Sequence, residues 1–294
     1  MKLVIGCGYL GKRVAAAWRD AGHEVAVVTR SPERAEAYTQ QGFTPIVADV
    51  MEPQSLRQLP QAETVLYAVG FDQRAGFSRQ QVYVSGLANA LDALTVDAPV
   101  PPSKFVYIST TGVYGAIDGD VTEKSPCEPT REGGEACLEA ECLLAAHSLG
   151  NRRVVLRLAG IYGPGRVPNR QALEKGEPIV AAPDSRLNLI HVDDACRVVL
   201  AAEAQAVPPA LYLVSDGNPP TRSEYYAEVA QQLGVPVPTL QWPPQDVPQT
   251  STGRTRGDSA KIIRNDKMLS ELQVKLAYPD FRSGLRQALS RQAD

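Results

Sequence analysis

The sequence is poor in histidine, in aromatic residues and in net charge. Of its 294 residues only three are histidine and 6% are aromatic, and 30 Lys and Arg face 33 Asp and Glu, which gives a net charge of −3. A chain this close to neutral has no basic field to hold nucleic acid or an anionic membrane, so neither is expected as a partner. Any site for an anion has to be local.

Paired cysteines and long apolar runs are also missing. The five cysteines, which include no Cys-x-x-Cys pair, are Cys7, Cys127, Cys137, Cys142 and Cys196. Their odd number and the absence of a secretory leader predict reduced thiols in the cytoplasm. No His, Cys and Asp residues have metal-ligand spacing, so no metal is expected. The apolar opening Met1 to Ile5 is cut short by the glycines that follow it, and no apolar run reaches about 18 residues, so no transmembrane helix is expected.

What remains is an ordinary globular composition, 44% hydrophobic and 21% charged, in which short β-branched runs alternate with amphipathic stretches. This alternation predicts an α/β fold, a doubly wound parallel sheet (Rossmann fold) with a small C-terminal substrate lobe. Strands are expected at 2–5, 24–28, 44–48, 64–69, 105–109, 154–158 and 211–214. A helix that ends at Gly22 is expected after the first strand, and one that opens with Ser31-Pro32-Glu33 after the second. Further helices are expected near 82–94, 132–148, 193–205 and 221–233, the last opened by a Thr221 and Glu224 capping box.

The alternation weakens after about residue 165 and returns between 189 and 215. We therefore predict a dinucleotide-binding domain, 1–165 plus 189–215, and a smaller substrate-binding lobe, 166–188 plus 216–294. Five prolines in 235–249 predict an extended connector rather than a sheet strand.

The strongest motif is Gly6-Cys7-Gly8-Tyr9-Leu10-Gly11, which lies between an expected strand and an expected helix. In the dinucleotide fingerprint, the first glycine allows a tight turn, the second lets the backbone approach a pyrophosphate, and the third permits close helix packing. Free amides at the helix start would bind the phosphates. The alternative is a structural glycine turn.

The second strand is followed by Arg30 and Ser31, where enzymes that use NAD usually carry a carboxylate for the ribose 2′-hydroxyl. A guanidinium can bind a 2′-phosphate through two hydrogen bonds, and Ser31, next to Arg30 in the sequence, adds a hydroxyl. We therefore expect NADP to be preferred over NAD. A solvated arginine is the alternative. Asp49 follows the third strand and could accept from the adenine amino group, or serve as a turn residue.

With these motifs the chain resembles, from end to end, the extended short-chain dehydrogenase/reductase superfamily, in the NAD-dependent epimerase/dehydratase family. Besides the glycine motif, the resemblance rests on ordered blocks: Ala48-Asp49-Val50, Ala68-Val69-Gly70, Val84 to Leu87, Ile108 to Gly115, Arg157 to Arg166, Asn188 to Asp194, and Leu211 to Gly217.

The resemblance implies a role for each matched position. Gly6, Gly8 and Gly11, with the Tyr9 and Leu10 amides, would hold the pyrophosphate, Asp49 and Val50 would flank adenine, and Ala68, Val69 and Gly70 would line the ribose, while Leu158 and Ala159 would approach the nicotinamide. Thr110 takes the place of the family's catalytic Ser/Thr, and its neighbour Thr111 is the alternative if the register shifts by one residue. The substrate candidates are Arg166, Asn188, His191 and Arg256; solvated arginines and a structural histidine are the alternatives.

One departure concerns the family's Tyr-x-x-x-Lys pair on the helix after Thr110. Aligned on Glu141, this sequence has Gly133 and Cys137 at the two positions, as is typical of the atypical YeeZ-like subgroup. Without the pair no evident group exchanges a proton with the reacting oxygen. Tyr114, Tyr162, Glu135 and His191 are candidate substitutes, although aromatic residues more often pack than react.

Two functions follow from these observations. The first is an NAD(P)-binding, epimerase/dehydratase-like oxidoreductase that acts on a sugar-like or nucleotide-linked, anionic small molecule, with Thr110, Tyr114 and Tyr162 as catalytic candidates. The second is a non-catalytic NADP-binding sensor or interaction protein. The absent pair favours the second, whereas the retained Thr110 and the basic segment around Arg256 favour the first.

Overall fold

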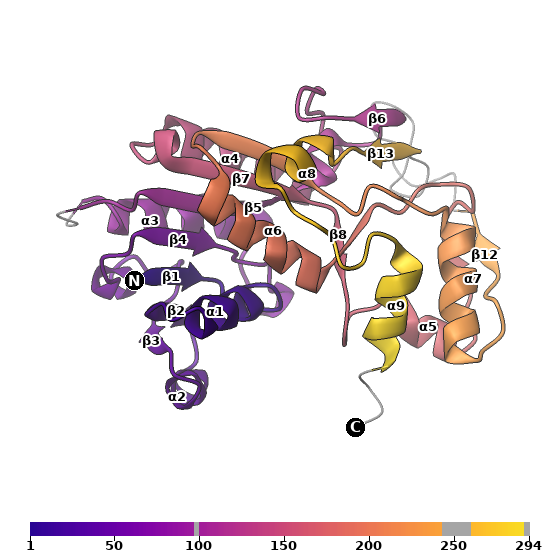
Figure 1. Ribbon diagram of the computed structural model, residues 1–294, viewed down its shortest axis with the longest axis horizontal. Coiled ribbons are helices and arrows are strands. Elements are labelled where there is room, and N and C mark those ends of the chain that lie inside the picture. Colours follow the sequence, from indigo (N-terminus) through magenta and orange to yellow (C-terminus); the bar gives the residue numbers. More distant parts are fainter. Residues whose placement is uncertain (97–99, 243–259, 291–294) are drawn as a thin grey trace. The chain divides into compact units, whose positions relative to one another are not determined.

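The computed structural model describes residues 1–96, 100–242 and 260–290 (Figure 1). Strands and helices alternate through the first half of the chain, as expected. The strands are β1 (Lys2–Ile5), β2 (Val25–Thr29), β3 (Thr44–Val47), β4 (Thr64–Tyr67), β5 (Lys104–Thr110), β6 (Gly119–Val121), β7 (Arg153–Leu158), β8 (Gly160–Tyr162), β9 (Ile179–Val180), β10 (Leu189–His191), β11 (Ala210–Val214), β12 (Leu240–Gln241) and β13 (Lys261–Ile263). The helices are α1 (Gly11–Asp20), α2 (Pro32–Gln40), α3 (Gly86–Ala93), α4 (Glu132–Ala146), α5 (Arg170–Glu174), α6 (Val192–Gln205), α7 (Arg222–Leu233), α8 (Asp266–Leu272) and α9 (Phe281–Ser290).

Seven strands form one sheet in the order β11-β7-β5-β4-β1-β2-β3. The strands from β3 to β5 pair in parallel, with Leu3 opposite Ala26 on one side and Val65 on the other. Strands β1, β2 and β4 are buried along their whole length, which is why they read as continuous apolar runs in the sequence. The predicted Rossmann-type α/β fold is confirmed.

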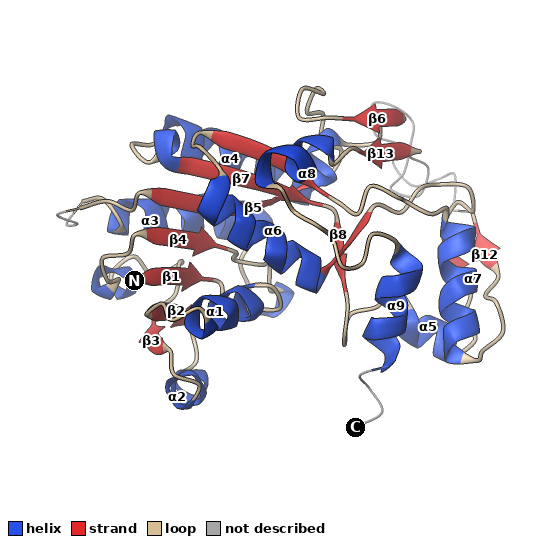
Figure 2. Cartoon of the chain, in the orientation of Figure 1, coloured by secondary structure: helices blue, strands red, loops and turns tan. Residues whose placement is uncertain are grey.

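Helices cover both faces of this sheet (Figure 2). Leu3 and Ile5 of β1 belong to the same core cluster as Leu87 and Leu91 of α3. Val4 points to the opposite face, where its side chain packs against the start of α1. The two-residue period of the strand therefore distributes one apolar run over two helical layers.

The chain divides into two compact units. Unit 1 contains residues 1–110, 131–157 and 198–212, and unit 2 contains residues 111–130, 158–197 and 213–294. Compared with the boundaries expected from the sequence, residues 111–130, 158–165, 189–197 and 213–215 group with the second unit. The predicted boundaries concern domains that bind cofactor and substrate, which this grouping does not test, so they stay a prediction.

Unit 2 contains three short parallel strand pairs, β8 with β10, β9 with β12, and β6 with β13. Helices α7 and α9 pack together around a core that includes Tyr225 and Phe281. Helix α7 opens with the predicted capping box, because Thr221 Oγ1 accepts from the Glu224 amide and the Glu224 carboxylate accepts from the Thr221 amide. The segment 235–249 was expected to be an extended connector without a strand, but Leu240–Gln241 pairs with β9 as a short strand. Residues 243–249 lie outside the described residues.

Two further findings bear on function. The helix expected near 82–94 begins with a π-helical turn, Gln81–Ser85, before α3. Among the helices of the described ranges, none has the length and apolar character needed to cross a membrane.

Candidate functional site

The glycine-rich turn joins β1 to α1 and depends on glycine at two of its three positions. Gly6 has a φ of +98°, and a Cβ atom there would lie 2.4 Å from the carbonyl carbon of Ala68 at the end of β4. A Cβ on Gly11 would lie 2.3 Å from the Gly6 carbonyl oxygen. The first and third glycines therefore close the strand-turn-helix unit, as the fingerprint requires.

Gly8 differs from its two neighbours in the motif. It is exposed, and a Cβ atom on it would meet no heavy atom within 4 Å. Leu10, the N-cap residue of α1, has no side chain that could satisfy the first amides of the helix. An open glycine beside an uncapped helix start fits a pyrophosphate, which would accept from these amides.

Arg30 follows β2 and is held by a carboxylate. Its Nη2 atom lies 3.0 Å from Asp72 Oδ2, and both side chains are about half exposed, 50% and 46%. Asp72 also caps a short helical turn by accepting from the Arg74 amide, and this amide, followed by Arg30, lowers the pKa of the carboxyl. Ser31 caps α2 by accepting from the Arg34 amide, and its hydroxyl donates to Glu33.

The residues expected around adenine and ribose follow the ends of β3 and β4, which are separated in the sheet by β1 and β2. Asp49 accepts from the Met51 amide in a turn, so the turn role proposed as its alternative is present. Val50 is buried and packs where a Cβ on Gly86 would stand. Ala68 donates to the Ile5 carbonyl, and Gly70 is exposed with open space around its Cα. The segments that follow the paired strands β1 and β4 thus both leave open space, one at Gly8 and the other at Gly70.

Thr110 ends β5, and α4 carries no tyrosine or lysine at the pair's positions. Gly133 lies in the first turn of α4, and Cys137 one turn later is buried. Burial, followed by the Glu141 carboxylate, raises the pKa of the Cys137 thiol to about 12. The thiol therefore stays protonated near neutral pH and cannot supply the positive charge of a lysine.

Glu141 fixes α4 to the sheet. Its carboxylate lies 2.6 Å from Arg157 Nη2 of β7 and accepts from the Ser109 hydroxyl of β5 at 2.5 Å. All three residues are buried, so this pair has a structural role, and breaking it would leave a buried charge.

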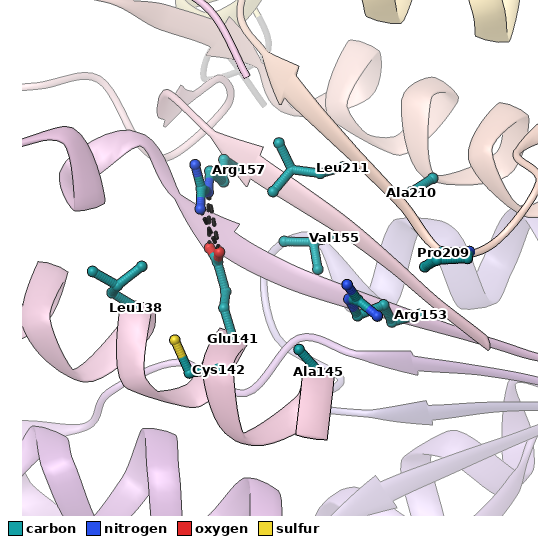
Figure 3. A pocket seen from close by; sticks show the side chains of 10 residues that line it. All are labelled: Leu138, Glu141, Cys142, Ala145, Arg153, Val155, Arg157, Pro209, Ala210 and Leu211. Atoms are coloured by element: carbon teal, nitrogen blue, oxygen red, sulfur yellow. Dashed lines mark hydrogen bonds and ion pairs between the residues drawn. The ribbon is translucent and has the colours of Figure 1, made fainter. Parts of the chain in front are cut away.

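A cavity of about 290 Å³ lies beside that ion pair, between α4, β7 and β11 (Figure 3). Leu138 and Cys142 of α4 face Val155 of β7 and Leu211 of β11 across it. None of the residues predicted to bind cofactor or substrate lines this cavity. It is a separate feature from the glycine turn.

The two tyrosines proposed as catalytic substitutes are packed inside unit 2. Tyr114 and Tyr162 are both 0% exposed. Tyr162 belongs to the apolar core of the unit, where burial raises the pKa of its phenol and its hydroxyl has no hydrogen-bond partner among the described residues. Their catalytic role stays a prediction, and it requires this packing to open.

Asn188 and His191 are engaged within unit 2. The Asn188 side chain donates to the Lys261 carbonyl and accepts from the Ile263 amide, so it holds β13. His191 is 0% exposed, its ring lies 4.1 Å from that of Tyr278, and its Nε2 atom is 2.9 Å from Gln287 Oε1. Their substrate roles stay predictions, and these contacts are those of structural residues.

The remaining candidates are a turn residue, two buried residues at the end of β7, and an arginine outside the described residues. Arg166 closes a tight turn with Gly163 through hydrogen bonds in both directions, and Leu158 and Ala159 are buried. In the basic segment, Lys261 donates to the Gly115 carbonyl, whereas Arg256 lies outside the described residues. Within the described ranges, no three His, Cys, Asp or Glu residues gather as metal ligands would.

Three polar residues in the segment between β4 and α3 were missed in the sequence: Asp72, Arg79 and Tyr83. Asp72 lies 42 residues from its partner Arg30, and nothing local in the sequence indicates that pairing. Arg79 and Tyr83 are four residues apart, a spacing that places two side chains on one face of a helix. That spacing was the signal that could have found them.

Comparisons with known proteins agree with this geometry. Residues 3–214 match the model of the NAD dependent epimerase/dehydratase family. The chain is 26% identical to Protein YeeZ of Escherichia coli (strain K12) over 94% of this chain and 96% of that protein. A conserved protein of unknown function from Silicibacter pomeroyi is 27% identical and superposes with a TM-score of 0.78 over 100% of this chain and 99% of that one.

A more distant structure shares the fold. UDP-glucose 4-epimerase of Thermotoga maritima, solved with UDP-glucose, is 19% identical with a TM-score of 0.79 over 99% of this chain and 98% of its own. The glycine turn, the seven-stranded sheet and the match over residues 3–214 lead to one conclusion: the chain belongs to the NAD-dependent epimerase/dehydratase family.

Proposed function

We propose that the protein is an NADP-dependent oxidoreductase or epimerase that acts on a nucleotide-linked, sugar-like substrate. The observation that carries this proposal is the open glycine turn with a guanidinium, in place of a carboxylate, directly after β2. The Thermotoga maritima structure, with UDP-glucose bound on the same fold, supports the substrate class.

The residues of unit 1 fit a dinucleotide. The exposed Gly8 and the uncapped start of α1 would hold the pyrophosphate, and the open edge at Gly70 would admit the ribose. When bound, the nicotinamide would exchange a hydride with the substrate carbon. Thr110, at the end of β5, would orient the reacting oxygen.

Preference for NADP rests on Arg30. An ionised 2′-phosphate carries more charge than the Asp72 carboxylate and matches the planar guanidinium, so it would compete for this partner. The ion pair with Asp72 is exposed and therefore weak, which leaves Arg30 able to change partners.

Calorimetry with NADPH and NADH tests this preference. NADPH should bind more tightly by roughly 5- to 150-fold, the range expected for a charge-assisted pair. Arg30→Asp should remove the difference, whereas Arg170→Gln, which alters an arginine of α5, should leave it intact. An unchanged NADPH to NADH ratio in Arg30→Asp would show that the 2′-phosphate assignment is wrong.

The second candidate function is a non-catalytic sensor of NADP. Gly133 and Cys137 at the positions of the family's pair favour it, since neither side chain can replace the phenol and lysine. Turnover separates the two functions. Oxidation of NADPH, or reduction of NADP, with a nucleotide-linked sugar excludes the sensor.

A further inference from the structure

The face of α4 that lacks the family's pair is covered by the segment that leads into α3. A Cβ atom on Gly133 would lie 3.7 Å from Arg79 Cδ, so the arginine stem occupies the space in front of this glycine. The π-helical turn Gln81–Ser85 packs directly on α4. The position that would otherwise hold a large side chain is therefore filled from a neighbouring helix.

Arg79 is fixed in this place from two sides. Its guanidinium lies 4.1 Å from the centre of the Phe71 ring, and its Nε atom is 3.6 Å from Glu132 Oε2, at the start of α4. The side chain is only partly exposed. It is thus a positioned cation rather than a freely solvated one.

Tyr83 stands next to this cation. Burial has the largest effect on the pKa of the Tyr83 phenol and raises it, as does the neighbouring Cys137 thiol of α4, whereas the Phe71 backbone and the positive charge of Arg79 lower it. Tyr83 is partly exposed, unlike Tyr114 and Tyr162. Among the three tyrosines, it combines partial exposure with a neighbouring positive charge.

The pair also lies at the correct edge of the sheet. Phe71 directly follows Gly70 after β4, and Arg79, which lies over the Phe71 ring, also reaches Glu132, the first residue of α4. Parallel strands β4 and β5 end at the same edge, where ligands bind in open α/β sheets. π-helical turns such as the one that contains Tyr83 occur frequently at functional sites.

We propose that Tyr83 is the catalytic acid/base and that Arg79 is the cation that stabilises its phenolate, so that the two replace the absent Tyr-x-x-x-Lys pair. The inference rests on the proposed function. In the oxidative direction the Tyr83 oxygen takes the proton of a substrate hydroxyl, while the electron pair of the substrate C–H bond leaves as hydride to oxidised NADP and a carbonyl forms. In the reverse direction the phenol returns the proton.

The turnover test uses the full chain with NADP and either UDP-glucose or UDP-glucuronic acid, and follows the absorbance of the reduced nicotinamide. Tyr83→Phe should lower the rate by about 10²- to 10⁴-fold, the usual contribution of general acid/base catalysis, and should leave NADPH affinity unchanged. Tyr225→Phe is the matched control, because that buried hydroxyl in unit 2 has no hydrogen-bond partner among the described residues. It should keep the full rate.

A titration tests the pair without any turnover. The pKa of Tyr83 is measured by NMR on protein labelled at the tyrosine ring carbons, with Tyr83→Phe used to assign the signal. Arg79→Gln should raise this pKa because the phenolate loses its cation, Arg79→Lys should largely restore it, and Arg170→Gln should not change it. An unchanged pKa in Arg79→Gln would overturn the pairing.

The outcomes separate the two proposals. Full turnover in Tyr83→Phe overturns the role of Tyr83 and leaves the proposed function standing. A wild-type protein that binds NADPH but exchanges no hydride with either sugar nucleotide overturns the catalytic role together with the proposed function. Loss of turnover in Tyr83→Phe, with NADPH binding intact and the expected titration shift in Arg79→Gln, supports both.

Discussion

The sheet edge of unit 1 and the interior of unit 2 both carry residues that match the family's motifs, but those of unit 1 are exposed whereas those of unit 2 are buried. At the unit 1 edge, Gly8 and Gly70 are open and Arg30 is half exposed with one exposed partner. In unit 2, Tyr162 and His191 are fully buried among their own neighbours. The difference teaches that a matched motif indicates a binding group only where the fold leaves that group available to a ligand.

The largest effect should come from Gly8→Val. The new side chain would occupy the open space through which the backbone approaches a pyrophosphate, so calorimetry should detect no binding of NADPH or NADH. Thermal unfolding should be nearly unchanged, because a Cβ at this position meets nothing within 4 Å.

Gly6→Val is the contrasting variant within the same turn. Its Cβ would collide with the Ala68 backbone, and the φ of +98° is unfavourable for a β-branched residue, so this variant should lose stability rather than binding alone. If Gly8→Val binds NADPH normally, the glycine turn is structural only.

His191→Ala tests the buried residues of unit 2, and it should lower stability rather than binding. The substitution removes a fully buried ring with its contact to Tyr278 and its hydrogen bond to Gln287, so the free energy of unfolding should fall by about 2–4 kcal/mol. Urea unfolding measures this loss, and NADPH affinity of the folded protein should stay unchanged. A stable variant with lost turnover would instead indicate a substrate contact.

Asp216→Asn should change how stability depends on pH. Burial raises the pKa of this carboxyl from 3.8 to about 7 in the folded protein. A raised pKa stabilises the fold below about pH 4, and this contribution is lost as the pH rises through 7, by on the order of a few kcal/mol.

Urea unfolding at several pH values between 4 and 8 checks this expectation. The wild-type protein should lose stability across the window relative to Asp216→Asn, whose neutral amide can still accept from the Asn218 amide. Parallel curves for the two proteins would mean that Asp216 does not titrate in this range.

The smallest effect should come from Asp72→Asn. The amide can still accept from the Arg74 amide, so the loop is kept, but Arg30 loses its charged partner. NADPH should then bind roughly two- to fivefold more tightly, as expected for release of an exposed ion pair, while NADH affinity should not change. Equal tightening of both cofactors would point to an effect of overall charge.

Sequence patterns predicted the parts of the fold whose physics is local. The glycine turn, the strands of unit 1 and the capping box at Thr221 each depend on residues that are close in the chain, and the structure contains all of them. The short strand pairs of unit 2 were not predicted, since a two-residue strand such as Leu240–Gln241 has too few residues to show a period.

The candidate site was predicted only in its cofactor half. The partner of Arg30 is Asp72, and the space before Gly133 is filled by Arg79; both contacts join residues at least 42 positions apart. Long-range contacts of this kind depend on how helices and strands pack, which a local pattern does not encode. The absence of the family's pair was visible in the sequence, but the group that occupies its place was not.

The π-helical turn at Gln81–Ser85 has an evolutionary consequence. A wider turn of this kind can arise when one residue is inserted into an ordinary helix. The insertion rotates the side chains that precede it by about 100° around the helix axis relative to those that follow it. The apolar face of α3 can then stay on the sheet while Arg79 turns toward α4. A single inserted codon can thus bring an arginine to the start of α4 without a change to any residue of the core.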